Sequence, residues 1–568
     1  MTLSEALSRI EEARDKPRTR RLFLVCGFEP LHLRTFLSAH LAQRFDGESA
    51  EIKTGLYGDL EGTLASAAAS DAGAAALVLE WSNLDPRLGL RSAGGWHVSV
   101  QGDILATCRD RFARILDKLR AVAAHMPVAV VPPTLSIPFL GHSAGWQIGV
   151  NELEMEKLLI TFLADAARIE RVSILNPARL AALSPAAKRL NAAGELSTGF
   201  PYTLEHASIV AGEIVQTLFP PGPMKGLITD LDGTFWSGIV GELGAAGVSW
   251  NMADHTQVHG LYQQLLRHFS EMGVLLAVAS KNELSLAEET MRRADLYIPA
   301  GCFFPMCADW GAKSRHVAEI LRVWNIGADS VVFVDDSPME LEEVKTVFPS
   351  MTCLQFSKQP AAALSLFVQL RDLFGKPVLQ QEDALRQASL KAFHESAPAG
   401  DSVDFVRGLN GTVTFDVIEG SASPRLLELV NKTNQFNLNG ARISEAQWLR
   451  HLEDESGFVV SVSYQDKFGP LGVIAVVAGK RLADCIDVST WVMSCRAFSR
   501  HIEFHTLEYL FESMGAAKIT FAFCATERNQ PLQQLFENAG IAGQPGTLTL
   551  TREQFAAAGH IFPHQVAG

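Results

Sequence analysis

The sequence predicts an α/β protein of three domains. The chain has 568 residues, roughly three to four times the length of a typical domain. Short apolar runs alternate with helix-patterned segments through the first two thirds, and β-branched runs follow one another closely in the last third. We expect domains at 1–220, 221–378 and 401–568, with a connector at 379–400.

In the first domain, apolar runs at 21–26, 75–80 and 127–131 are predicted strands. The segments 31–45 and 103–125 have the apolar spacing of amphipathic helices. Short buried strands separated by helices are typical of a parallel sheet that is covered by helices. The sequence therefore predicts a parallel α/β fold for this domain.

The proline-rich run 220–223 marks the boundary to a second α/β domain. Strands are predicted at 226–229, 274–279 and 330–334, with helices between them, and the same alternation indicates a second parallel sheet. The polar stretch 380–391 has a helical pattern and is interpreted as part of the connector.

The last domain has a different pattern, with predicted strands close together in the chain. Because short connections favour antiparallel pairing, we expect a mixed α+β fold with a partly antiparallel sheet. The predicted strands are 412–417, 457–464, 472–477 and 518–523, and the predicted helices are 502–514 and 531–539.

Composition and charge exclude several classes of protein. The chain has 49 Lys and Arg against 63 Asp and Glu, a net charge of −14, which disfavours a nucleic-acid partner. The eight cysteines show no paired spacing and are interpreted as reduced thiols. The N-terminus lacks a signal-peptide pattern, and no apolar stretch reaches the length of a membrane span. We expect a cytoplasmic protein without a membrane partner.

The strongest local signal is the run Gly226-Leu-Ile-Thr-Asp230-Leu-Asp232-Gly-Thr234. An apolar strand that ends in Asp-x-Asp places two carboxylates at the carboxyl edge of a sheet, where α/β proteins bind ligands. Asp230 is suited to be a nucleophile toward phosphorus or a carbonyl carbon, and Asp232 to give and take a proton. The alternative is a polar strand-to-loop turn, which Asp and Gly also favour.

Three further candidate motifs follow this run along the chain. Ser280 ends the second strand of this domain and can hydrogen-bond a phosphoryl oxygen. Lys313 can offset negative charge, although a lysine before a helix is more often a solvated surface charge. Asp335 and Asp336 end the third strand. Crowded carboxylates repel unless a cation lies among them, and Mg²⁺ prefers oxygen ligands. The candidate Mg²⁺ ligands are Asp230, Asp232, Asp335 and Asp336.

These elements resemble the four motifs of the haloacid dehalogenase (HAD) superfamily of phosphotransferases. The resemblance implies a Rossmann-like sheet in the middle domain and bound Mg²⁺. It implies Asp230 as the nucleophile, Asp232 as the general acid and base, and Ser280 and Lys313 as phosphoryl binders. Phe235 departs from the pattern, which has a smaller aliphatic residue there, and we expect it to alter packing rather than chemistry.

Motif spacing bears on access to the site. The interval from Asp230 to Ser280 is 280 − 230 = 50 positions, and from Ser280 to Lys313 it is 313 − 280 = 33. Neither interval holds a full cap domain in addition to the core helices. We expect a site that is open to bulky substrates or closed by another domain of the chain.

Four segments narrow the resemblance to the FkbH-like family, of the HAD-IIIC type. Segment 234–242, with its Trp-Ser-Gly-Ile-Val-Gly-Glu run, is similar to that family, although a glycine-rich flap around a core tryptophan is an alternative interpretation. Segments 429–437, 491–496 and 526–540 also resemble the family's signatures. By this resemblance the candidate substrate-binding residues are Thr234, Trp236, Lys281, Asn282, Asn431 and Asn434. The asparagines are equally well explained as capping groups.

The outer domains resemble two other folds. The last domain is similar to GNAT acyltransferases, but the glycines of their pyrophosphate loop are replaced in 496–501, which argues against coenzyme A. Cys495 is a candidate acyl-carrying thiol, with a buried inert thiol as the alternative. The first domain resembles a flavodoxin-like or SGNH-hydrolase-like unit. Gly27-Phe28-Glu29 stands where the nucleophile motif is expected, and His206 lacks the expected Asp, so we expect a non-catalytic docking domain.

The resemblance implies a function for the whole chain. FkbH-like proteins take the glyceryl group of 1,3-bisphosphoglycerate, remove phosphate and place the glyceryl group on the thiol of an acyl carrier protein, in polyketide or related biosynthesis. We therefore expect a phosphorylated small-molecule donor and an acyl carrier protein as partners. Because the chain is acidic, docking of an acidic carrier needs a locally basic patch, for which Arg425, Lys432 and Arg442 are candidates. The alternative, and the more common explanation of such residues, is that they are scattered exposed cations.

Two alternatives from other classes stay open. One is a Mg²⁺-dependent phosphatase that acts on a sugar phosphate or another small phosphometabolite. The other is a non-catalytic scaffold in a biosynthetic assembly, against which the complete set of Asp230, Asp232, Lys313 and Asp335 argues.

Overall fold

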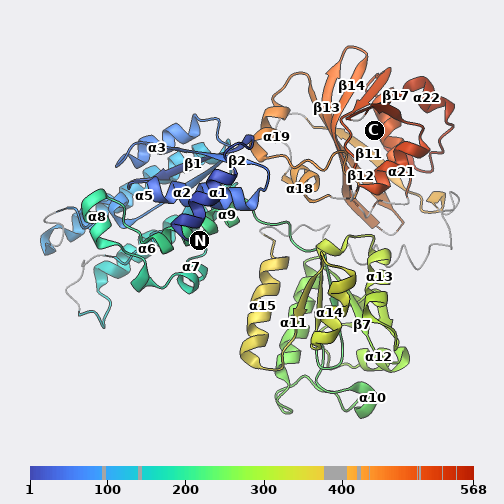
Figure 1. Cartoon of the computed structure of the whole chain (residues 1–568), viewed down its shortest axis with the longest axis horizontal. Helices are drawn as coiled ribbons and strands as arrows, with labels where there is room; N and C mark the ends of the chain where they lie inside the picture. The colour runs from blue at the N-terminus through green and yellow to red at the C-terminus, as the bar shows by residue number, and fades with distance from the viewer. Residues whose placement is uncertain are drawn as a thin grey trace. The chain divides into compact units, whose positions relative to one another are not determined.

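The computed structural model contains two compact units (Figure 1). It describes residues 1–92, 97–137, 144–376, 406–418, 424–433, 435–467, 469–494, 497, 500–526, 529–544 and 546–567. One unit comprises Met1–Pro221 with Ser444–Arg450, and the other comprises Gly222–Ile443 with His451–Gly568. The predicted connector 379–400 lies outside the described residues, and the division of the chain into three domains stays a prediction.

The first unit is built on a five-stranded parallel sheet in the order β2-β1-β3-β4-β5. This is the strand order of flavodoxin-like folds. The strands are β1 (Arg18–Cys26), β2 (Ser49–Thr54), β3 (Ala74–Val78), β4 (Val128–Val131) and β5 (Val172–Ile174). The helices are α1 (Leu3–Glu12), α2 (Leu31–Arg44), α3 (Leu60–Ala68), α4 (Trp81–Leu84), α5 (Gln101–Ala123), α6 (Val150–Ala166), α7 (Pro177–Leu183), α8 (Ala192–Thr198) and α9 (Leu204–Leu218).

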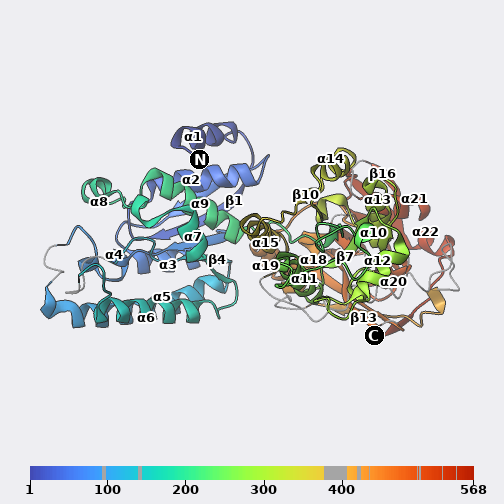
Figure 2. The same ribbon diagram turned by 90° about the horizontal axis from the view of Figure 1, so that it is seen from below.

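Helices cover both faces of this sheet, as Figure 2 shows. One face packs α1, α2 and α9 against alternate side chains of β1 such as Leu22 and Leu24. The other packs α3, α5 and α6 against Phe23 and Val25. Because both faces of the central strands are buried, they read in the sequence as continuous apolar runs.

A second parallel sheet, in the order β10-β9-β6-β7-β8, begins the other unit. Its strands are β6 (Gly226–Thr229), β7 (Leu275–Ser280), β8 (Met306–Ala308), β9 (Val331–Asp335) and β10 (Thr352–Gln355). Its helices are α10 (Val240–Leu243), α11 (Gln257–Glu271), α12 (Leu284–Met291), α13 (Lys313–Trp324), α14 (Pro338–Val347) and α15 (Pro360–Phe374). Helices α11, α12 and α15 pack on one face and α13 and α14 on the other.

The third sheet is mixed and has eight strands in the order β16-β17-β15-β14-β13-β12-β11-β18. Strands β11 to β14 pair antiparallel, and β15 pairs parallel with β14. The strands are β11 (Thr412–Val417), β12 (Gly457–Asp466), β13 (Gly469–Leu482), β14 (Cys485–Met493), β15 (Lys518–Phe521), β16 (Ala542–Gln544), β17 (Thr547–Thr551) and β18 (Gln565–Ala567). The helices are α18 (Pro424–Lys432), α19 (Glu445–Leu452), α20 (Ile502–Glu512), α21 (Gln530–Asn538) and α22 (Arg552–Ala557).

The α/β fold class is confirmed, with two parallel sheets and one mixed sheet. Four strands of the parallel sheets, β2, β5, β8 and β10, were not predicted. They are the edge strands, three to six residues long, and none is fully buried along its length. An apolar run identifies a strand that is buried on both faces, and edge strands do not meet that condition.

The sequence predicts reduced cysteines and no membrane span, and both predictions can be compared with the described residues. Each cysteine in them is a free thiol. None of the helices in them combines the length and apolar character needed to cross a membrane.

The central strand β6 needs a glycine at its start. A Cβ atom added to Gly226 would lie 2.4 Å from a ring carbon of Trp324, a distance that real Cβ contacts do not reach. Trp324 is 1% exposed, and its indole nitrogen donates a hydrogen bond to the carbonyl of Phe304 at 2.7 Å. Moving the ring away would therefore cost packing contacts and this hydrogen bond.

We predict that Gly226→Ala lowers the free energy of unfolding by about 1–3 kcal/mol because it overpacks this contact. Chemical denaturation measures the loss. The matched control is Gly301→Ala, where an added Cβ meets no atom within 4 Å, and it should change stability by less than about 0.5 kcal/mol. Equal stabilities of the two variants would contradict the prediction.

Candidate active site

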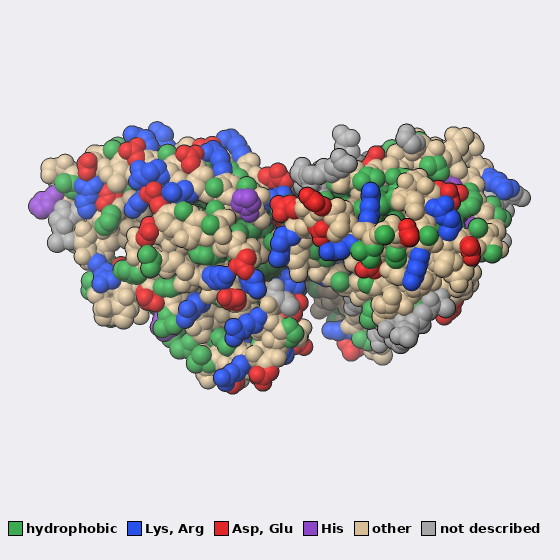
Figure 3. All heavy atoms as spheres, turned by 90° about the horizontal axis from the view of Figure 1, so that it is seen from above, with side chains coloured by type: hydrophobic (Ala, Val, Ile, Leu, Met, Phe, Trp, Pro, Cys, Tyr) green, Lys and Arg blue, Asp and Glu red, His purple; other side chains and the backbone are tan. Residues whose placement is uncertain are grey.

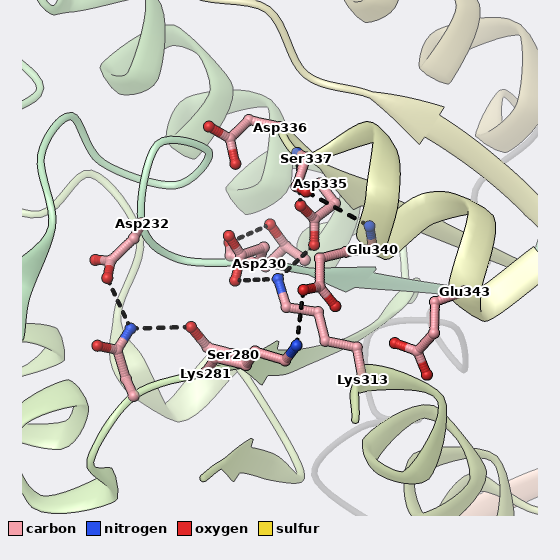
Figure 4. A network of polar contacts seen from close by, with 12 residues as sticks. Asp230, Asp232, Ser280, Lys281, Lys313, Asp335, Asp336, Ser337, Glu340 and Glu343 are labelled. Atoms are coloured by element: carbon pink, nitrogen blue, oxygen red, sulfur yellow. Dashed lines mark hydrogen bonds and ion pairs between the residues drawn. The ribbon is translucent and has the colours of Figure 1, made fainter. Parts of the chain in front are cut away.

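The candidate site lies at the carboxyl edge of β6, β7 and β9 (Figure 4). These are adjacent strands of a parallel sheet, so residues that directly follow or end them meet at one edge. Asp230 follows β6, Ser280 ends β7 and Asp335 ends β9. The structure therefore brings together the strand-end residues that the sequence singled out.

Lys313 links two of the carboxylates. Its Nζ lies 2.8 Å from Oδ1 of Asp230 and 2.5 Å from Oδ2 of Asp335. All three residues are at most 5% exposed. Lys313 begins α13, and it is not the solvated surface charge that a lysine before a helix more often is.

Burial and charge pull the pKa values of this cluster in different directions. Burial raises the pKa of Asp230 to about 7, against the lowering effect of the Lys313 ammonium. Burial acts to lower the pKa of Lys313, but the Asp230 and Asp335 carboxylates outweigh it and raise that pKa. Burial, followed by the negative charge of Asp335, raises the pKa of Asp336. Three carboxylates thus share one lysine, which favours a further cation at the site.

The residues present fit a divalent cation. Asp230, Asp335 and Asp336 each offer a carboxylate oxygen within 4.8 Å of the others. Gly233 makes room for this arrangement: its φ is +75°, and a Cβ there would lie 2.3 Å from Oδ2 of Asp336. The backbone nitrogen of Ser337 donates to Oδ1 of Asp335 at 2.8 Å and orients it. Hard carboxylate oxygens are the ligands that Mg²⁺ prefers.

The Asp232 carboxylate accepts its hydrogen bonds outside this cluster, and its role as a metal ligand stays a prediction. Its Oδ1 accepts hydrogen bonds from the Trp236 indole nitrogen at 2.6 Å and from the Val240 backbone nitrogen at 3.0 Å. Its Oδ2 accepts one from Nδ2 of Asn282 at 3.0 Å. These hydrogen bonds fix the Asp232 carboxylate, which Figure 4 shows apart from the three-carboxylate cluster.

Three of the four predicted substrate-binding residues near this site have side-chain partners within the protein. Trp236 and Asn282 contact Asp232, and Nδ2 of Asn282 also donates to Oγ of Ser280 at 3.1 Å. Nζ of Lys281 donates to Oε1 of Glu340 at 2.7 Å. Thr234 is fully buried, and among the described residues its hydroxyl has no hydrogen-bond partner.

Helices contribute residues that the sequence analysis missed. Nδ1 of His259 contacts the carbonyl of Thr234 at 2.9 Å, and Nε2 of Gln263 donates to the carbonyl of Phe235 at 3.0 Å. Both lie on α11, one turn apart, and hold the loop after β6. Glu340 on α14 pairs with Lys281. The sequence carries no signal for these contacts except the i, i+4 spacing of His259 and Gln263.

The candidates in the last third of the chain are only partly described. Cys495 and Asn434 lie outside the described residues. Asn431 bonds the backbone of Ile443 through both polar atoms, each at 2.9 Å, which favours the structural interpretation of this asparagine.

The three candidate docking cations also have local partners. Arg425 and Lys432 both pair with Glu428, and Arg442 donates to the carbonyl of Thr433 at 2.9 Å. Nearby groups of the chain therefore offset part of the positive charge of these three residues. On the face that Figure 3 shows, acidic and basic side chains are interspersed.

In the first unit, His206 contacts other side chains instead of a nucleophile after β1. Its ring nitrogens lie 2.9 Å from the hydroxyls of Ser184 and Thr134, and burial lowers its pKa to about 3. Phe28, in the expected nucleophile segment, is 4% exposed and packs against Phe200 and Tyr202.

Comparisons with known proteins find a similar fold. The sequence matches no protein-family model and no curated protein. A solved structure of the N-terminal part of the protein BF1531 from Bacteroides fragilis matches with a TM-score of 0.52 and 18% sequence identity, over 66% of this chain and 100% of that chain. That protein is described as containing a phosphatase domain complexed with Mg. At this identity the likeness shows a shared fold.

We predict that Lys313→Met lowers the free energy of unfolding by about 3–5 kcal/mol in metal-free buffer, because it leaves two buried carboxylates without their cation. Chemical denaturation in the presence of a chelator measures the loss. Lys157→Met is the matched control: its amine lies 3.5 Å from Oε2 of Glu154 and its side chain is 72% exposed, so the cost should be about 1 kcal/mol or less. A Lys313→Met variant as stable as the control would contradict the prediction.

Proposed function

We propose that this protein is a Mg²⁺-dependent phosphotransferase of the HAD type, with Asp230 as the nucleophile. The observation that carries the proposal is the buried Asp230–Lys313–Asp335 cluster with Asp336 beside it. Two features support a catalytic site over a scaffold. Burying this many charges is costly, and a structural core does not need them. The shared fold with a structure that contains a phosphatase domain is consistent with this class.

The residues have complementary roles in the proposed reaction. Asp230, Asp335 and Asp336 would hold Mg²⁺, which offsets the negative charge of the phosphoryl group when it is bound. The Lys313 ammonium and the Ser280 hydroxyl bind phosphoryl oxygens. Asp230 attacks phosphorus and the bond to the leaving oxygen breaks, which gives a phosphoaspartate.

Asp232 moves the proton in both halves of this reaction. It protonates the leaving oxygen in the first half. In the second half it takes a proton from water, which attacks phosphorus, so that inorganic phosphate leaves and Asp230 is regenerated. Each proton given to a leaving group is recovered from water.

The finer proposal is an FkbH-type glyceryl transfer from 1,3-bisphosphoglycerate to an acyl carrier protein. It is supported by the segments 234–242, 429–437, 491–496 and 526–540, and Cys495 is the proposed acyl-carrying thiol. The first domain and the GNAT-like domain would then serve docking and transfer. A cytoplasmic location and a carrier partner belong to the same proposal.

A plain phosphatase on a small phosphometabolite is the second candidate. The nucleophile, lysine, acid–base carboxylate and metal ligands all lie between Asp230 and Asp336, so phosphate release needs no residue of the last domain. The two candidates therefore share the phosphoryl-binding residues and differ in the bond that breaks. In the phosphatase, Asp230 attacks phosphorus and the leaving oxygen departs with its group; in acyl transfer, the thiol attacks the carbonyl carbon of the acyl phosphate and inorganic phosphate leaves.

We predict that Asp230→Asn lowers Mg²⁺-dependent phosphate release from acetyl phosphate by at least about 10³-fold, because an amide is not a nucleophile toward phosphorus. A colorimetric phosphate assay measures it. The isosteric control is Asp254→Asn on the exposed surface, which should keep wild-type activity. Activity of Asp230→Asn within tenfold of wild type would contradict the proposed nucleophile.

We predict that the wild-type protein with Mg²⁺ and 1,3-bisphosphoglycerate adds a glyceryl group to the thiol of a cognate acyl carrier protein, which intact-protein mass spectrometry detects. Cys495→Ala should abolish loading and leave phosphate release from acetyl phosphate unchanged, because the thiol acts only in acyl transfer. The free thiol Cys524 gives the control Cys524→Ala, which should load normally. Phosphate release without loading of the carrier would favour the plain phosphatase.

A further inference from the structure

Three hydrogen-bond donors, two from the loop after β6 and one from the segment after β7, fix the carboxylate of Asp232. Nε1 of Trp236 and the backbone nitrogen of Val240 donate to Oδ1, at 2.6 and 3.0 Å. Nδ2 of Asn282 donates to Oδ2 at 3.0 Å. The two carboxylate oxygens are thus held from different directions. The loop after β6 holds Oδ1, and Asn282, which follows β7, holds Oδ2.

The supporting side chains are rigid because they are buried. Trp236 is fully buried and its ring packs edge-on against Phe235, which in turn packs edge-on against Phe303. Asn282 is 2% exposed, and its amide also bonds the Ser280 hydroxyl. The large residue at position 235, unusual for the motif, therefore supports the tryptophan that contacts Asp232.

We infer that Trp236 and Asn282 are positioning residues for Asp232, and that its Oδ2 is the atom that gives and takes the proton. A carboxylate offers about four acceptor positions, two on each oxygen. Both positions of Oδ1 are taken by groups that only donate, an indole N–H and a backbone N–H. Among the residues that the structure describes, Oδ2 receives a single donor and keeps one position, where the transferred proton sits.

This inference rests on the proposed phosphotransfer and adds a dependence on the leaving group. When the bond from phosphorus to the leaving oxygen breaks, the proton on Oδ2 passes to that oxygen. A phenolate leaving group is strongly basic and needs this proton. The acetate released from acetyl phosphate is weakly basic and leaves without it. Loss of the positioning residues should therefore slow phenyl phosphate far more than acetyl phosphate.

The test compares kcat/KM of Trp236→Phe and Asn282→Ala on these two donors with Mg²⁺ present. This constant covers the steps up to the phosphoaspartate, in which the leaving group differs. Each variant should lose about 10- to 100-fold more kcat/KM on phenyl phosphate than on acetyl phosphate, part of the contribution of general acid catalysis. Asn282 also bonds the Ser280 hydroxyl, and a loss through that contact lowers both donors equally. Thermal denaturation checks that both variants are folded. If Trp236→Phe does not fold, Asn282→Ala alone is used for the test.

Two controls separate positioning from a loss of structure. Trp250→Phe removes another buried indole, whose nitrogen donates to the carbonyl of Asp295 at 3.1 Å, and should change neither donor by more than about 2-fold. In the Asp232→Asn background, adding Trp236→Phe should have no further effect on phenyl phosphate, because both changes remove the same proton transfer.

The outcomes distinguish this inference from the proposal that it rests on. A wild-type protein that releases phosphate from neither donor overturns both. A wild-type protein active on both donors, with variants that slow the two donors equally or add to Asp232→Asn, overturns the positioning roles and leaves the phosphotransferase proposal standing.

Discussion

The ammonium of Lys313 between the buried carboxylates of Asp230 and Asp335 is the interaction on which the region around the second parallel sheet depends. Moving one charge out of water is costly, and this site buries three. The cluster is tolerable only because each carboxylate lies within 2.8 Å of the lysine nitrogen. With Asp336 added, negative charge still exceeds positive charge, and a divalent cation is the natural complement.

Much of the surrounding structure holds this cluster in place. The strand order puts β6 between β7 and β9, so that their ends converge. Gly233 lets Asp336 approach the loop after β6, and His259 and Gln263 bind the carbonyls of that loop from α11. Asp232 is held by its own set of donors, apart from the three carboxylates that could hold a cation. Two acidic residues two positions apart can therefore do different chemistry, because the fold gives them different neighbours.

In the first unit and in the last third of the chain, the described polar residues make structural contacts. In the first unit, the polar groups at the end of the sheet are used internally: Thr134 contacts both His206 and Glu80 in the core. In the last third, Asn431 ties its segment to the backbone of Ile443. Such contacts account for polar residues in structural terms. A role in transfer then depends on residues such as Cys495, which lies outside the described part of the chain.

The sequence by itself determined the fold class, the central strands of the two parallel sheets and the strand-end residues, because buried parallel strands are continuous apolar runs and their ends share one edge. It could not show the edge strands, which are short and half-exposed. Nor could it show that Trp236 and Asn282 contact Asp232, or that Lys281 pairs with Glu340. These pairs join residues up to 59 positions apart. Only the tertiary structure decides which side chains of different elements share a hydrogen bond.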